Sequence, residues 1–72
     1  MTSSLTVRQM RADILHAALL DEPVERLADI ASVPRVALWR PEIRAAAASD
    51  LLREGRIAET LTGRLIVRSA GR

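Results

Sequence analysis

The chain contains no cysteine, lysine, asparagine, phenylalanine or tyrosine among its 72 residues, and Trp39 is its only aromatic side chain. Without cysteine, neither a disulfide nor a thiolate metal site can form. Because these residue types are missing and there is only one histidine, the chain has few of the acids, bases and nucleophiles that catalysis uses. No glycine-rich phosphate loop and no metal-ligand spacing replaces them. We therefore expect no enzymatic activity, no metal and no cofactor.

Long apolar runs are also missing. No segment approaches the roughly 20 apolar residues that a membrane span requires, and the N-terminal residues lack the apolar run of a signal peptide. These features predict a cytoplasmic protein with no membrane segment. The length predicts one domain over residues 1–72, with flexible ends at 1–5 and 69–72.

Positive charge is concentrated in the second half of the chain. All eleven basic residues are arginines, and the formal net charge is +2. Residues 1–34 carry three arginines against five acids, whereas residues 35–72 carry eight against four. This imbalance predicts an anionic partner for the second half. The alternative is that scattered arginines only keep a small domain soluble.

A first helix is predicted from a capping box at Thr6 and Gln9 to an end near Leu20. His16 lies outside its apolar stripe and is expected on the surface. The residues expected to face the core are Val7, Met10, Ile14, Ala17 and Ala18, widened by Leu15 and Leu19.

The sequence Asp-Glu-Pro at residues 21–23 indicates a second helix with Pro23 at its first position. This helix should end around Ser32, because Pro34 disfavours helix at the residue before it. Residues 33–41 follow as either a short strand or a single helical turn. The apolar side chains expected to pack this segment on the core are Val36, Leu38 and Trp39.

Pro41 is expected to begin a third helix that ends near Glu54. Asp50 and Glu54 are expected on a solvated flank of this helix. The expected buried stripe consists of Ile43, Ala46, Ala47 and Leu51, and the expected outward positions are Glu42, Ala45, Ala48 and Ser49.

The third helix ends in the sequence Asp-Leu-Leu-Arg-Glu-Gly-Arg-Ile at residues 50–57, and a glycine-containing hairpin is predicted over 57–68. This pattern resembles the end of the recognition helix in bacterial winged-helix regulators. The resemblance implies a mainly helical α+β fold, a three-helix winged helix-turn-helix with a C-terminal β-hairpin wing. Two departures are visible: the nine residues 33–41 replace a turn of about 3–4 residues, and the usual strand between the first two helices is missing unless Arg35–Trp39 supplies it.

The winged-helix resemblance implies double-stranded DNA as the partner, with the hairpin arginines on phosphates and Thr60, Thr62 and Gly63 at its tip. Arg44 is the only residue on the third helix suited to bidentate base readout. The residues expected to contact DNA are Arg35, Arg40, Arg44, Ser49, Arg56, Arg64 and Arg68, with Arg72 on the tail.

The favoured prediction is thus a small DNA-binding regulator, expected to form a homodimer. The alternative is a protein-interaction module of the same fold, an accessory or inhibitory protein that docks through its Ala-rich helix or the Trp39 segment. Trp39 itself is expected to be a core residue, with a role as partner anchor as the alternative. An exposed apolar patch that includes Leu38, Trp39 or Leu52 would favour the interaction module.

Overall fold

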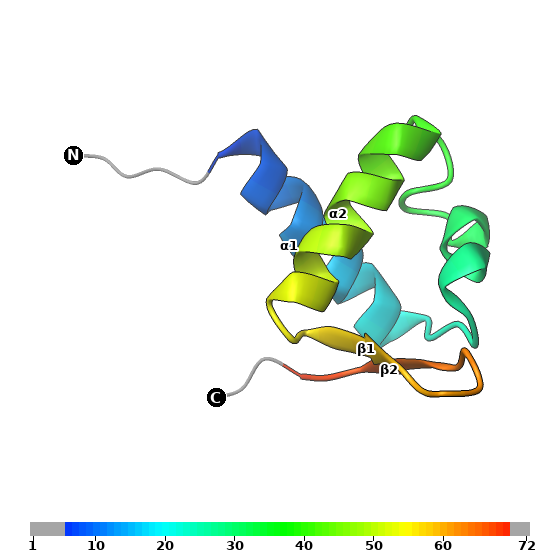
Figure 1. Ribbon diagram of the computed structural model, residues 1–72. Coiled ribbons are helices and arrows are strands. Elements are labelled where there is room, and N and C mark those ends of the chain that lie inside the picture. Colours follow the sequence, from blue (N-terminus) through cyan, green and yellow to red (C-terminus); the bar gives the residue numbers. More distant parts are fainter. Residues whose placement is uncertain (1–5, 70–72) are drawn as a thin grey trace.

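The computed structural model describes residues 6–69 and contains three helices and a two-stranded antiparallel sheet (Figure 1). The elements follow in the order α1 (Val7–Asp21), the 3-10 helix η1 (Leu27–Ser32), α2 (Pro41–Arg53), β1 (Ile57–Glu59) and β2 (Leu65–Val67). α1 and α2 pack against each other, and the hairpin lies across one end of both helices. The mixed α+β class is therefore confirmed. Within residues 6–69, every helix is too short or too polar to cross a membrane.

α1 begins at the predicted capping box. The backbone N–H of Gln9 donates to Thr6 Oγ1 at 3.0 Å, and the backbone N–H of Thr6 donates to Gln9 Oε1 at 3.3 Å. These two bonds satisfy amide groups that the first helical turn leaves without partners.

Only part of the predicted core face of α1 is buried. Leu15, Ala18 and Leu19 are buried, as predicted, whereas Val7, Met10 and Ile14 are 60%, 47% and 44% exposed, and Ala17 is exposed as well. α1 has apolar residues on nearly all sides, so the sequence pattern could not decide which side would be buried. The two leucines fill the space opposite α2, together with the small side chains of Ala12 and Ala18.

The second helix begins later than expected. Pro23 lies outside it, and η1 starts at Leu27 with Arg26 as its extended N-cap. Arg26 forms an isolated antiparallel bridge with Arg64, next to the 2.7 Å hydrogen bond from Leu65 N to Glu25 O. This bridge places a short extended segment between the first two helices. Residues 35–39, which the sequence left open as a source of this strand, form turns and a bend instead.

Residues 33–40 form consecutive turns, which agrees with the helical-turn alternative rather than the strand. Val36 N donates to Val33 O at 3.0 Å, and Trp39 N donates to Val36 O at 3.1 Å. Val36 is buried and Trp39 is half-buried against the core, as predicted. Leu38 is 97% exposed, so its predicted place in the core is wrong.

α2 begins at Pro41, as predicted, and ends in a Schellman motif at Gly55. Gly55 has φ +76°, its N–H donates to Leu52 O at 3.1 Å, and Arg56 N donates to Leu51 O at 2.9 Å. The predicted burial of Ala47 and Leu51 is confirmed; Ile43 and Ala46 are only half-buried. Ala48 is buried rather than outward.

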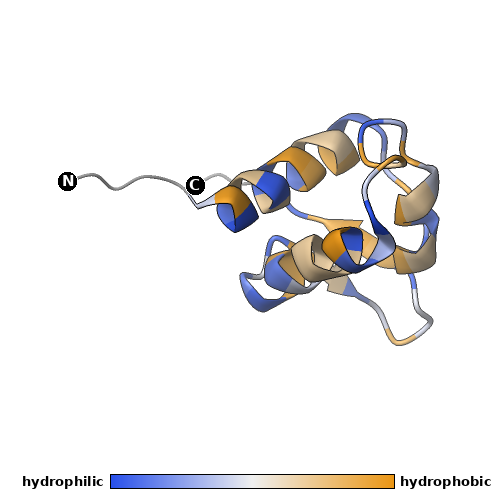
Figure 2. Ribbon diagram, turned by 90° about the horizontal axis from the view of Figure 1, so that it is seen from above, coloured by the Kyte–Doolittle hydropathy of each residue, from blue (hydrophilic) through white to orange (hydrophobic). Residues whose placement is uncertain are grey.

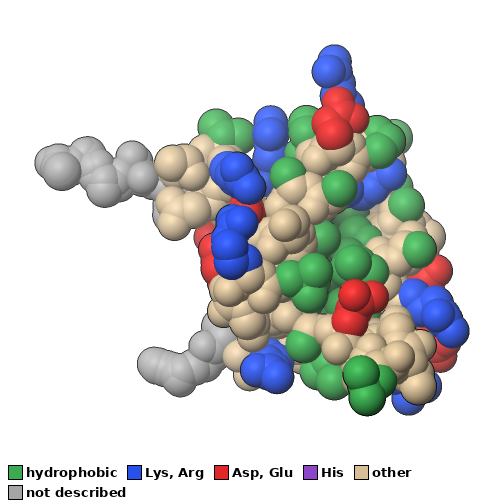
Figure 3. Space-filling model, viewed as in Figure 1, with side chains coloured by type: hydrophobic (Ala, Val, Ile, Leu, Met, Phe, Trp, Pro, Cys, Tyr) green, Lys and Arg blue, Asp and Glu red, His purple; other side chains and the backbone are tan. Residues whose placement is uncertain are grey.

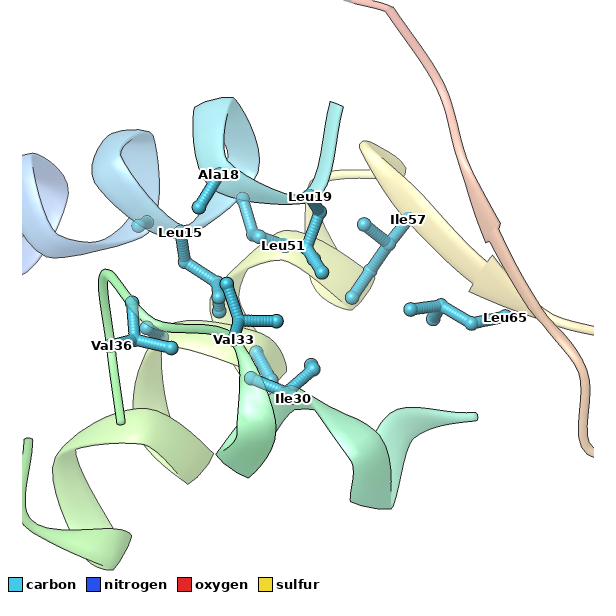
Figure 4. Packing of buried hydrophobic residues seen from close by; sticks show 12 residues of the cluster. Leu15, Ala18, Leu19, Ile30, Val33, Val36, Leu51, Ile57 and Leu65 are labelled. Atoms are coloured by element: carbon cyan, nitrogen blue, oxygen red, sulfur yellow. The ribbon is translucent and has the colours of Figure 1, made fainter. Parts of the chain in front are cut away.

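The hairpin pairs Ile57 with Val67 and Glu59 with Leu65. Its inner face adds Ile57 and Leu65 to a core formed by α1, η1, the following turns and α2 (Figure 4). Seen from above, hydrophobic and hydrophilic residues alternate along both main helices (Figure 2). The core thus extends from the helices to the hairpin and fixes the position of the hairpin.

Candidate nucleic-acid interface

The outer face of the hairpin presents two arginines. Because Leu65 is buried and side chains alternate along a strand, residues 64, 66 and 68 lie on the face that points away from the core. Arg64 and Arg68 are exposed, and their guanidinium groups form no ion pair with any residue in 6–69. Ile66 lies between them and is 43% exposed.

Arg26 joins this surface, although it lies in the first half of the sequence and far from the predicted hairpin. Its backbone bridge to Arg64 brings it to the hairpin tip, where Arg26, Arg64, Glu25 and Thr62 line a shallow cavity of about 210 Å³. A Cβ atom at Gly63 would lie 3.4 Å from Arg26 Nη1, so the glycine leaves room for this guanidinium. No local signal could have identified Arg26, because its position depends on a long-range strand contact. We call Arg26, Arg64 and Arg68 the hairpin arginine group.

The tip of the hairpin is ordered by its own hydrogen bonds. Thr60 N donates to Arg64 O at 2.8 Å, and Arg64 N donates to Thr60 Oγ1 at 3.1 Å. The Thr60 and Thr62 hydroxyls are 3.0 Å apart, and Gly63 adopts φ +86°. The turn therefore holds its backbone, and the arginine beside it, in a defined position.

Arg56 points inward and is bound within the domain. Its guanidinium donates to Asp13 at 2.7 Å, to Glu54 at 3.3 Å and to His16 Nδ1 at 3.1 Å. The hydrogen bond to Asp13 is the main reason why the pKa of Arg56 is raised above its usual value. This arginine links α1 to the base of the hairpin, and 27% of its side chain is exposed.

His16 is 3% exposed, so the prediction that it lies on the surface is wrong. Its Nε2–H donates to the carbonyl of Arg68 at 2.6 Å, which leaves Nδ1 as the acceptor for Arg56. Burial is tolerated because both ring nitrogens have partners. His16 therefore fixes the backbone of the hairpin arginine group at one end.

Three of the predicted contact residues lie at the opposite end of α2 from the hairpin. Arg44 Nη1 donates to the carbonyls of Val36, Ala37 and Trp39 at 3.3, 3.1 and 2.6 Å, and this binding holds the 33–39 turns. Arg35 pairs with Asp21 at 2.8 Å, and Arg40 is exposed at the N-cap of α2.

α2 covers about 20 Å from one end to the other at 1.5 Å per residue, so Arg35, Arg40 and Arg44 are not brought together with the hairpin arginines. Ser49 is exposed midway along α2, and Arg72 lies outside the described residues.

Asp50 is buried, at 4% exposure, which contradicts its predicted place on a solvated flank. Arg8 binds both of its carboxylate oxygens, at 2.7 and 2.8 Å, and Arg53 binds one of them as well. The hydrogen bonds from Arg8 are the main reason why the pKa of Asp50 is lowered. These contacts join the start of α1 to the end of α2 and occupy two further arginines.

An apolar groove of about 350 Å³ separates η1 from α2 and appears as a hollow lined with hydrophobic side chains in Figure 3. Arg44 is the one charged residue in its lining. Leu52 is half-buried in its wall. The residues that line the groove are Leu27, Ala28, Ile30, Ala31, Pro41, Arg44, Ala45, Ala48, Ser49 and Leu52.

Residues 6–69 bring together no group of three or more histidine, aspartate or glutamate side chains that could hold a metal ion. The sequence matches no model of a known protein family, no curated protein is significantly similar to it, and no solved structure matches its fold.

Proposed function

We propose that the domain binds double-stranded DNA through the hairpin arginine group, in a winged-helix arrangement. The observation that carries the proposal is that Arg64 and Arg68 on the hairpin and Arg26 beside it have exposed side chains that form no ion pair with an acidic residue in 6–69, although Glu25 lies in the same cavity as Arg26 and Arg64. Guanidinium groups bind phosphate oxygens in bidentate geometry.

The order of the elements supports the winged-helix part of this proposal. The extended segment at Arg26 precedes η1, and the hairpin follows α2, so all three extended segments lie together beside the helices. The isolated bridge at Arg26 lies where a winged helix has its short first strand, which supports the proposal. It also explains why Arg26 belongs to the same surface as the hairpin.

Binding should be electrostatic and sensitive to salt. Each phosphate that an arginine neutralises contributes about 0.9 to the slope of log affinity against log salt concentration. We expect Arg64→Ala and Arg68→Ala each to weaken binding to a random duplex and to reduce this slope by about 1. Arg26→Ala should have the same effect, although the sequence alone does not indicate it.

Fluorescence anisotropy with a labelled duplex at several salt concentrations tests these variants. Arg40→Ala is the matched control, because Arg40 is an exposed arginine at the N-cap of α2 without an ion pair in residues 6–69. It removes the same charge from the end of α2 that lies away from the hairpin. Equal weakening by Arg40→Ala would show that only net charge matters, and the absence of duplex binding at low salt would refute the proposal.

A second candidate function is protein interaction through α2 or the Trp39 segment. Two observations favour it: Leu38 is 97% exposed, and the groove between η1 and α2 is apolar. On this alternative, Leu38→Ser or Ala45→Arg abolishes capture of a specific host protein and Arg64→Ala does not. Loss of capture with Arg64→Ala and not with the other two variants would refute it.

A further inference from the structure

α1 has a second apolar face that nothing in residues 6–69 covers. Val7, Met10 and Ile14 are 60%, 47% and 44% exposed, and Ala17 is exposed as well. The core of the domain uses the other side of the same helix. In the view from above, α1 is an outer layer of the molecule, with its outward side free of packed elements (Figure 2). A helix that is apolar on both sides usually has both sides in contact with protein.

The spacing of this outward face is that of a helix-pairing seam. Val7, Met10, Ile14 and Ala17 are separated by three, four and three residues, which is the repeat that keeps one helix in register with another. Val7 and Ile14 occupy equivalent positions of this repeat. Among parallel coiled coils, β-branched side chains at those positions are typical of pairs rather than of larger bundles. We call these four residues the outer seam.

We infer that the outer seam is a self-association surface, on which α1 of a second copy packs in parallel about a two-fold axis. Under this symmetry each seam residue meets its own equivalent, so the surface is complementary to itself. The small core of a 72-residue chain makes additional burial through association favourable.

The charges beside the seam select the parallel orientation. Arg11 flanks the seam on one side and Asp13 on the other, and both are exposed. In a parallel pair each copy's Arg11 side faces the partner's Asp13 side, so opposite charges adjoin. In an antiparallel pair Arg11 sides would face each other. Asp13 binds Arg56 through Oδ1, and its Oδ2 forms no hydrogen bond within residues 6–69.

The parallel orientation has a consequence that rests on the proposed function. His16 and Asp13 connect α1 to the base of the hairpin, so two parallel α1 helices carry both hairpins at the same end of the dimer. Both hairpin arginine groups could then contact one duplex. The dimer itself is tested without DNA, so its failure and the failure of DNA binding are separate results.

Cysteine cross-linking tests the arrangement directly, because the chain has no cysteine of its own. Met10→Cys places one thiol in the seam, and Ala45→Cys places one on the exposed surface of α2 as a matched control. Under mild oxidation we expect Met10→Cys to form a disulfide-linked dimer and Ala45→Cys to remain monomeric. The reverse pattern, or no cross-link at position 10, would refute the parallel seam.

Sedimentation equilibrium of the full chain provides the second test. We expect a dimer for the wild type and at least a tenfold weaker association for Ile14→Arg, with an unchanged far-UV circular dichroism spectrum. Val7→Glu, at the most exposed seam position, should weaken the association to the same extent. It keeps the test valid if Ile14→Arg does not fold. A wild type that is monomeric at high micromolar concentration, or a dimer that survives both changes, would overturn the inference.

Discussion

Replacing His16 by alanine should destabilise the domain and release the base of the hairpin. The ring is 3% exposed and bridges α1 to the backbone of Arg68, through a 2.6 Å hydrogen bond to the carbonyl. On its other side it accepts a hydrogen bond from Arg56. His16→Ala removes both bonds at once and leaves space where the ring was.

The expected cost follows from these contacts. The partly buried carbonyl of Arg68 loses its only side-chain donor, which costs about 1–3 kcal/mol, and the lost packing of the ring adds about 1 kcal/mol. Arg56 keeps Asp13 and Glu54 as partners, so it contributes little to the loss. The total of about 2–4 kcal/mol approaches the roughly 3–5 kcal/mol that a core of this size supplies.

Urea denaturation followed by circular dichroism measures this change in the free energy of unfolding. Hydrogen exchange should also show faster opening of the Arg68 and Arg56 amides than of α2, because the lost contact lies at the base of the hairpin. The control is Gln9→Ala, which removes an exposed capping side chain from the same helix and should cost about 1 kcal/mol or less. A loss below about 0.5 kcal/mol for His16→Ala would show that the ring does not anchor the hairpin.

Three further changes probe other parts of the fold. Asp50→Asn should lower the melting temperature at neutral pH, because Arg8 loses its carboxylate partner. The pKa of Asp50 is lowered in the folded protein, so the carboxylate stabilises the fold above its unfolded pKa of about 3.9, and this stabilisation is lost as the pH falls through the folded pKa. In thermal melts from pH 7 to pH 2, the melting temperature of Asp50→Asn should therefore fall less with acid than that of the wild type. Leu51→Ala should cost about 2–5 kcal/mol in urea denaturation, because the side chain is fully buried, and a cost below 1 kcal/mol would contradict the core described here. Gly55→Ala should cost about 1–2 kcal/mol from its φ of +76° alone, because nothing lies within 4 Å of the added methyl group, and a neutral effect would exclude that backbone strain.

Local signals predicted the boundaries of the two long helices well. The capping box at Thr6, Pro41 at the first position of α2 and Gly55 at its end all act within a few residues of where they occur. Their effect depends on backbone hydrogen bonds and permitted dihedral angles, which the neighbouring residues determine. For the same reason the glycine-containing turn of the hairpin could be placed from the sequence.

Signals that depend on distant partners could not be read in the same way. Arg26 becomes part of the hairpin surface through its bridge to Arg64, and Asp50 is buried because Arg8 reaches it from another helix. His16 is polar but is buried, because it hydrogen-bonds to a residue far along the chain, and Leu38 is apolar but is exposed. Neither outcome follows from the neighbouring residues in the sequence. The candidate site was therefore predicted only for the part that lies within the hairpin itself.

The same limit applies to counting charge. In a chain without lysine, arginine must supply both structural cations and surface cations. Structural arginines here bind carboxylates, carbonyls or a histidine nitrogen at fixed geometry, and these are Arg8, Arg35, Arg44, Arg53 and Arg56. The remaining arginines of residues 6–69 form no ion pair there, and three of them belong to the hairpin arginine group. The number of arginines in residues 35–72 therefore overstates the positive charge that is free to bind a partner. Conversely, the bridge to Arg64 brings Arg26, which belongs to the acidic residues 1–34, onto the hairpin surface. What a polyanion meets is decided by which guanidinium groups the fold leaves without an internal partner.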